Sequence, residues 1–182
     1  MNDLILLADL VKKRNALETE ITGLIDRPAA IGHIGEYIAA RIFDIDLNKS
    51  ASAKASDGHF RSGPLEGRSV NIKWYAMREG LLDVTSDRSL HYYLVLAGPQ
   101  SSSMTSRGRA RPWTIDSVYL FNVRCLDDQL LLRKVKRGVA CSVAQELWEQ
   151  AELYPDQRNP ELVLSSEQRQ QLALFKVRSS DG

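Results

Sequence analysis

Residues 70–75, VNIKWY, alternate between apolar and polar side chains. In an extended chain Val70 and Ile72 point to one side, and Asn71 and Lys73 point to the other. This period of two predicts a β-strand. A lysine in a strand needs water or a negative partner for its ammonium group. The side that carries Asn71 and Lys73 is therefore either the solvent face of an edge strand or part of a polar site.

Further strands are expected on the C-terminal side of this segment. Residues 91–97, HYYLVLA, are almost continuously apolar or aromatic, which is typical of a central strand covered on both faces. Residues 117–123 indicate another strand. Asp127 and Asp128 indicate a turn, and residues 129–135 could return from it as a hairpin partner.

Helices are expected on both sides of these strands. Apolar side chains at helical spacing predict one helix over about 2–24, and Pro28 suits the first turn of a second helix that ends near residue 43. The pairs Ser142/Gln145 and Ser165/Gln168 match the capping box that begins a helix. The predicted order is N-terminal helices over 2–43, a sheet core over about 57–136 and C-terminal helices over about 142–175. It indicates a mixed α/β (α+β) fold, with a central mixed sheet flanked by helices.

Composition narrows the class of protein. The 182 residues are 43% hydrophobic and 26% charged, with a net charge of +1. One globular domain over 1–182 is the expectation, and disordered, collagen-like and disulfide-rich classes are excluded. No apolar run is long enough for a membrane span, and the N-terminus does not resemble a signal peptide. Cys125 and Cys141 form no metal-binding pattern, so a reducing, cytoplasmic location is expected.

Two carboxylates outside the strand, Glu36 and Asp57, are not required by packing of the core. Glu36 lies opposite the apolar face of its predicted helix and shares its own side with small residues such as Gly32, which would let the helix approach a neighbour closely. Taken alone, Glu36 is more often an exposed glutamate on an amphipathic helix. Asp57 is followed by Gly58, and such a pair is most often a turn.

Taken together, these residues resemble the active-site signature of the PD-(D/E)XK, or restriction-endonuclease-like, nuclease superfamily. The matching positions are Glu36 in a helix, Asp57 before a strand, and Asn71 with Lys73 inside the strand, with 13 residues between Asp57 and Asn71. The longer string IGEYIAARIF…SDG…GRSVNIKW is similar to a small-protein branch of that superfamily. The resemblance covers residues from about 31 to 75.

The resemblance implies a metal-dependent phosphodiester hydrolase that acts on DNA with Mg²⁺ or Mn²⁺. Asp57 would be the principal metal ligand, Glu36 a second or water-mediated ligand, and the carbonyl of Ile72 a third, which suits the oxygen preference of Mg²⁺. The metal would polarise the phosphate and support a hydroxide. Lys73 would orient the attacking water and stabilise negative charge, a role that we favour over that of a general base.

Asn71 departs from the family pattern, which usually has Glu, Asp or Gln at this position. Asparagine keeps a carbonyl oxygen that can bind a metal, but it supplies no negative charge. The loss of one charged ligand weakens Mg²⁺ binding. This departure keeps a second interpretation open, in which the chain is a catalytically inactive member of the same fold that binds nucleic acid or a protein.

A local basic segment could contact the phosphates of DNA. Arg107, Arg109 and Arg111 alternate in a segment without acidic residues, between two predicted strands. Arginine is suited to bidentate phosphate contacts, although the segment could equally be a solvated loop. DNA and a second copy of the chain are the expected partners, the latter by analogy with enzymes that cut both strands. No membrane and no small-molecule cofactor are expected. A third interpretation, an accessory scaffold protein, predicts no DNA affinity.

Overall fold

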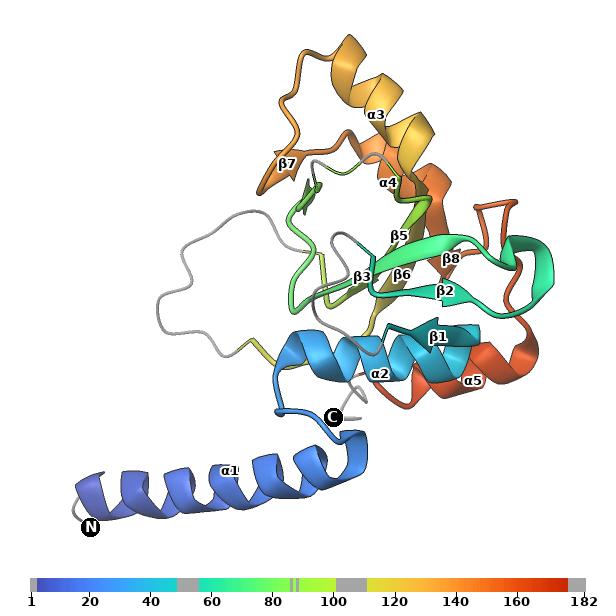
Figure 1. Ribbon diagram of the computed structural model, residues 1–182. Coiled ribbons are helices and arrows are strands. Elements are labelled where there is room, and N and C mark those ends of the chain that lie inside the picture. The colour runs from blue at the N-terminus through green and yellow to red at the C-terminus, as the bar shows by residue number, and fades with distance from the viewer. Residues whose placement is uncertain (1–2, 49–55, 86, 88, 101–110, 177–182) are drawn as a thin grey trace.

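The computed structural model describes residues 3–48, 56–85, 87, 89–100 and 111–176. These residues form a mixed α+β fold with a six-stranded sheet in the order β1-β2-β3-β5-β6-β8 and a small two-stranded sheet, β4-β7 (Figure 1). The strands are β1 Ile45–Leu47, β2 Gly58–Phe60, β3 Ser69–Tyr75, β4 Leu81–Leu82, β5 Tyr92–Ala97, β6 Ser117–Asn122, β7 Cys141–Ser142 and β8 Glu152–Tyr154. The helices are α1 Asp3–Ile25, α2 Ile31–Phe43, the 3-10 helix η1 Gly63–Leu65, α3 Val123–Leu132, α4 Gln145–Ala151 and α5 Ser166–Ala173.

The centre of the sheet is built from β3 and β5, which run parallel, while the other neighbouring strands of this sheet pair antiparallel. Every residue of β5 is buried, which confirms the expectation of a central strand covered on both faces. The predicted alternation in β3 is confirmed as well. Ile72 lies beside Leu94 in the register, and Lys73 lies beside Val95.

Each face of the sheet has its own helices and its own apolar core. Ile38 and Ala39 of α2 and Leu172 of α5 pack against the face that carries Ile72 and Leu94. On the other face the core is formed by side chains of α3 and α4 together with those of β5 and β6, and its largest buried member is Trp148. Figure 1 shows α2 and α5 on one side of the sheet, and α3 and α4 on the other.

The prediction for residues 127–135 is wrong. Asp127 and Asp128 do not form a turn, and no strand follows, because residues Val123–Leu132 form α3. Val123, Leu126 and Leu130 recur at helical spacing and are buried, and the side chain of Asn122 caps the helix by accepting hydrogen bonds from two backbone N–H groups. This apolar stripe outweighs the turn preference of the two aspartates.

The sheet is also wider than expected. Strand β1 precedes the predicted start of the sheet core at residue 57, and β8 lies inside the segment predicted to hold only helices. Both are three-residue edge strands, which are too short to show a clear alternation in the sequence. The edges of a sheet are the positions where such short strands occur.

One of the two predicted capping boxes is confirmed. The hydroxyl of Ser165 accepts a hydrogen bond from the backbone N–H of Gln168, and the side chain of Gln168 bonds back to the backbone N–H of Ser165. Ser142 caps no helix, because it lies in β7, and α4 begins after Ala144 without a side-chain cap. At the N-terminus the predicted pair of helices is confirmed, although α2 begins at Ile31, after the turn that contains Pro28.

Gly58 lets β2 approach β1 closely. A Cβ at this position would lie 2.4 Å from the carbonyl oxygen of Asp46 and 2.9 Å from a side-chain methyl group of Ile45. We expect Gly58→Ala to lower the free energy of unfolding by about 1–3 kcal/mol, because the backbone of β1 must move away. Chemical denaturation measures the change. Gly32→Ala is the control, because nothing lies within 4 Å of its Cβ position, and equal stability of the two variants would contradict the prediction.

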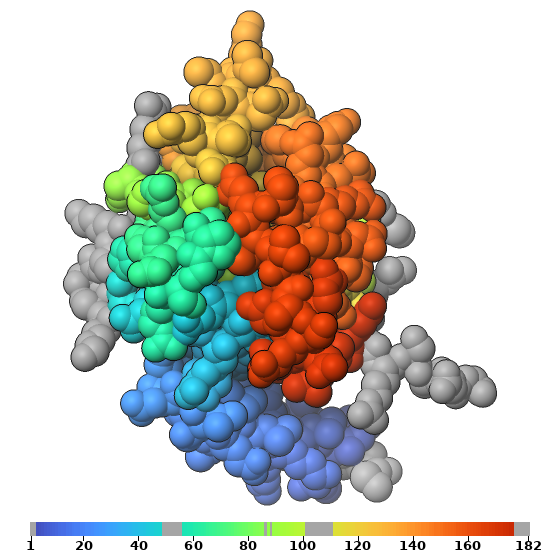
Figure 2. Space-filling model, turned by 90° about the vertical axis from the view of Figure 1, so that its right-hand side faces the viewer, coloured from blue at the N-terminus to red at the C-terminus, as the bar shows by residue number. Residues whose placement is uncertain are grey.

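Helix α1 differs from the rest of the chain. It has 23 residues and buries only Ile25. It lies along one side of the molecule, next to the turn that leads into α2 (Figures 1 and 2). Among the described residues, no helix is both long and apolar enough to cross a membrane.

Candidate active site

Asp57 lies directly before β2 and is bonded to β3 through both its backbone and its side chain. Its backbone N–H donates to the carbonyl oxygen of Val70 at 2.8 Å. Its carboxylate oxygen Oδ2 accepts a hydrogen bond from the backbone N–H of Ile72 at 2.6 Å. The paired register of β2 and β3 covers only Val70 and Ser69. Beyond that point the carboxylate of Asp57 takes the place of a strand partner, so Asp57 is more than a turn residue.

The backbone carbonyl of Ile72 points toward the same edge of β3. Within a strand the N–H and C=O groups of one residue lie on the same side, and this side alternates from residue to residue. The carbonyl of Val70 and the N–H of Ile72 both bond to Asp57, so both residues direct their backbone groups to this edge. The predicted third oxygen ligand therefore lies at the edge where the Asp57 carboxylate lies.

Helix α2 brings Glu36 to the site through a close contact with β3. A Cβ at Gly35 would lie 3.0 Å from the Cβ of Trp74, so the absence of a side chain lets the helix pack tightly on the strand. Glu36 follows in the sequence, and its side chain is only 18% exposed. Glu36 Oε2 accepts a hydrogen bond from Arg27 Nη1. Glu36 is thus held in place, which rules out the interpretation as an ordinary exposed glutamate.

Four charged groups act on one another at this edge of the sheet. Burial raises the pKa of Asp57 above its ordinary value, and the hydrogen bond from the Ile72 backbone lowers it. The charge of Glu36 raises the pKa of Asp57 further, while the charges of Lys73 and Arg27 lower it. The structure therefore brings together the predicted residues Glu36, Asp57 and Lys73.

Asn71 and Lys73 lie on the face of β3 opposite to α2, as the alternation predicts. Asn71 is buried, with 9% of its surface exposed, and Lys73 is partly exposed. In the register Asn71 lies beside Tyr93, and Lys73 lies beside Val95. This face is covered by the second apolar core, so the alternative of a solvent face on an edge strand is wrong. Asn71 and Lys73 are thus two polar side chains on a face of β3 that is otherwise covered by an apolar core.

The donor atoms at this edge fit a hard divalent cation. Asp57 and Glu36 supply carboxylate oxygens, and Ile72 supplies a backbone carbonyl, which are the ligand types that Mg²⁺ prefers while it keeps several waters. The repulsion between Glu36 and Asp57 also favours a cation between them. In the described residues no cluster of three His, Cys, Asp or Glu side chains is placed to hold a metal. The site therefore offers fewer charged ligands than a three-carboxylate site does.

Sequence reasoning missed Arg27. It lies in the turn between α1 and α2, pairs with Glu36 and is 40% exposed. No spacing rule connects it to Glu36, because the chain changes direction between the two residues. In the sequence Arg27 is only a basic residue before Pro28, and this pattern does not indicate a functional site.

The predicted basic segment is only partly described. Arg107 and Arg109 lie outside the described residues. The guanidinium of Arg111 lies 3.4 Å from Glu79 and remains 41% exposed. The neighbouring Trp113 is 46% exposed and lies 6.3 Å from the ring of Trp74.

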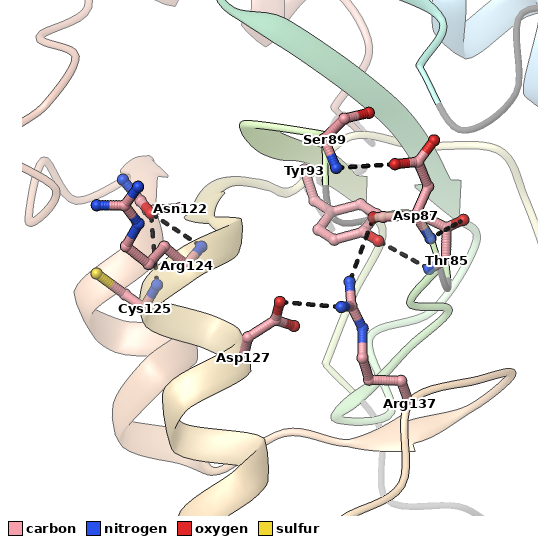
Figure 3. A network of polar contacts seen from close by, with 9 residues as sticks. All are labelled: Thr85, Asp87, Ser89, Tyr93, Asn122, Arg124, Cys125, Asp127 and Arg137. Carbon is pink, nitrogen blue, oxygen red and sulfur yellow. Dashed lines mark hydrogen bonds and ion pairs between the residues drawn. The ribbon is translucent and has the colours of Figure 1, made fainter.

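A hollow of about 1140 Å³ lies around the starts of β3 and β5 and beside α3. None of the predicted site residues lines it. Figure 3 shows polar contacts among residues of its wall and neighbouring residues such as Asp87. Arg137 contacts the carboxylate of Asp127 at 3.0 Å and donates to the backbone carbonyl of Asp87 at 3.4 Å. These contacts stabilise the wall, and we assign the hollow no function.

The raised pKa of Asp57 predicts a pH-dependent effect on stability. Because the folded state disfavours the charged carboxylate, stability is lost as the pH rises from the ordinary value of 3.8 through the raised pKa. We expect Asp57→Asn to be more stable than the wild type at pH 7 without metal, since asparagine still accepts the Ile72 hydrogen bond. The difference should vanish below pH 3.8. Chemical denaturation as a function of pH measures it, and a variant that is less stable at pH 7 would contradict the prediction.

Comparisons with known proteins add no assignment. A scan of family models gives no match to this chain, and a search of curated proteins gives none either.

Proposed function

We propose that this protein is a metal-dependent nuclease that hydrolyses phosphodiester bonds in DNA. The observation that carries the proposal is the position of Asp57, whose carboxylate is bonded to the backbone of Ile72 at the edge of β3. Glu36 and Lys73, which come from two other elements, both act on the charge of that carboxylate. Two carboxylates, a backbone carbonyl and a lysine at one strand edge match what phosphodiester hydrolysis requires.

The roles of the residues follow from their chemistry. Asp57 and the carbonyl of Ile72 would bind the cation directly, and Glu36 would bind it directly or through water. Mg²⁺ or Mn²⁺, when bound, polarises the phosphate and lowers the pKa of a water molecule. Lys73 places a positive charge where negative charge grows on the phosphate oxygens. Arg27 holds the Glu36 carboxylate in position through their hydrogen bond.

A nucleic-acid substrate is supported by the residues next to this edge. Trp74 packs on Gly35, beside Glu36, and its ring lies near the exposed ring of Trp113. Trp113 and Arg111 line the same groove. An exposed aromatic ring can stack on a base, and a neighbouring arginine can contact a phosphate. These contacts support a surface suited to a nucleic-acid strand at Trp113 and Arg111, linked through Trp74 to the helix that carries Glu36.

One observation favours a second candidate function, in which the protein binds nucleic acid without cleaving it. Asn71 occupies the position where the resembling nucleases usually have Glu, Asp or Gln, and Arg27 already neutralises part of the charge on Glu36. Both features lower the affinity of the site for a divalent cation. The two candidates differ in whether the carboxylates bind a metal.

Two experiments separate these candidates. Mn²⁺ is first titrated into the purified protein and its binding is measured by calorimetry. Cleavage is then assayed on plasmid and linear DNA. We expect binding by the wild type, loss of binding and cleavage in Asp57→Ala, and no change in the control Asp46→Ala, because Asp46 is exposed on β1. Absence of Mn²⁺ binding by the wild type at millimolar metal, with DNA affinity retained, would favour the second candidate.

A further inference from the structure

Helix α1 carries an apolar surface that the described part of the chain leaves exposed. Leu7, Leu10, Leu17 and Leu24 are 56%, 52%, 58% and 71% exposed, although they are apolar. Leucine side chains at these exposures are costly in water. An isolated helix of this length is also only marginally stable, because helices in proteins depend on packing of an apolar face. Packing of these leucines against a second chain would therefore stabilise the helix.

The apolar residues follow the spacing of a coiled coil. Six positions, which we call the seam, alternate in steps of three and four, and five of them are apolar: Leu7, Leu10, Arg14, Leu17, Ile21 and Leu24. Leucine occupies one heptad position three times, at 10, 17 and 24, and Ile21 occupies the other. Leucine at the d position with a β-branched residue at the a position favours a two-stranded coil. A polar residue at a single a position, here Arg14, specifies register at a cost in stability.

The charges that flank this seam are complementary between two copies. In a parallel pair the residue on one flank of a helix faces the residue five positions later on the other flank of its partner. This rule places Lys13 of each copy opposite Glu18 of the other copy. Arg14 contacts Glu18 within its own helix at 2.7 Å, so the charge of the central arginine is partly balanced.

Part of the seam lines a groove in the single chain. Leu17 and Ile21 form one wall of this groove of about 380 Å³, and Arg111 and Trp113 lie on the other. Covering the exposed seam leucines and their apolar neighbours in two copies would bury roughly 1,200 Å², which is at the lower end for a specific interface. The area is sufficient for a reversible dimer.

We propose that two copies of this chain associate through α1 as a parallel two-stranded coiled coil, with Lys13 of each copy paired with Glu18 of the other. The proposal depends on α1 alone and does not require that the protein is a nuclease. It assigns the exposed leucines of α1 to an interface.

Sedimentation of the full chain over a range of concentrations tests the association. We expect the wild type to be dimeric at micromolar concentration, and Leu10→Asp/Leu17→Asp to be monomeric, with a dissociation constant raised more than about 100-fold. Circular dichroism of both proteins checks that the body of the double variant is folded. A wild type that remains monomeric at about 100 μM would overturn the proposal.

Charge reversal tests the pairing itself. Lys13→Glu and Glu18→Lys should each weaken self-association about 10-fold, because each places like charges opposite one another. A mixture of the two variants should form a heterodimer as tight as the wild-type dimer, since both pairs are then attractive. Lys12→Glu, on the outer side of the helix, is the matched control and should change little. Failure of the mixture to recover would exclude the parallel pairing.

Discussion

Replacing Lys73 with methionine is expected to lower the rate of metal-dependent DNA cleavage by about 10²- to 10³-fold. Lys73 lies on β3 next to Ile72, and its charge acts on the carboxylate of Asp57. Methionine keeps an unbranched side chain of similar length and removes the charge. The ammonium group is assigned to the charge that develops in the transition state, so its loss affects the rate far more than the binding of substrate.

Measuring metal binding by Lys73→Met shows whether its slower cleavage comes from a lost metal or from the lost charge of the lysine. The charge of Lys73 lowers the pKa of Asp57, so its removal should not weaken the attraction of the carboxylates for a cation. We expect calorimetry to show Mn²⁺ binding by Lys73→Met at least as tight as by the wild type. Lys176→Met is the control, because Lys176 is exposed just after α5. Cleavage by Lys73→Met at the wild-type rate would exclude the catalytic role of this lysine.

The parts of the fold that were predictable are those with strong local patterns. The alternation of β3 and the continuous apolar run of β5 reflect burial that extends over six or seven residues in each strand. The capping box of Ser165 and Gln168 is likewise a local pattern, and it begins α5 as predicted. By contrast, α3 was missed because two adjacent aspartates suggested a turn, whereas tertiary packing of Leu126 and Leu130 determined the helix.

The candidate site was predictable to the extent that its residues have fixed spacing along the chain. Glu36, Asp57 and Lys73 were selected from a pattern, and the structure places them around one strand edge. The pairing of Glu36 with Arg27 depends on how the chain turns between α1 and α2, which no local rule describes. The seam of α1 could not be identified from the sequence, because its exposure depends on how the described part of the body packs around the helix.

Replacing Asn71 with aspartate is expected to tighten Mg²⁺ binding by about 10-fold or more, because the number of charged ligands controls the affinity of such sites. Asn71 is buried on the face of β3 that also carries Lys73, two residues away. Aspartate has nearly the same shape as asparagine, so the backbone need not move. The substitution restores the charge that the resembling nucleases usually carry at this position, and cleavage should rise with metal affinity.

The same substitution should make the metal-free protein less stable, which provides a second and independent measurement. A carboxylate at position 71 adds negative charge one residue from Ile72, to which Asp57 is bonded, in a buried place where water screens charge poorly. Thermal denaturation of Asn71→Asp should therefore show a lower Tm than the wild type in a chelator, and a larger rise on addition of Mg²⁺. Asn15→Asp is the control, because Asn15 is exposed on α1. If the stability falls but Mg²⁺ affinity does not rise, the side chain at position 71 lies outside the reach of the cation. The metal would then depend on Asp57, Glu36 and the Ile72 carbonyl alone.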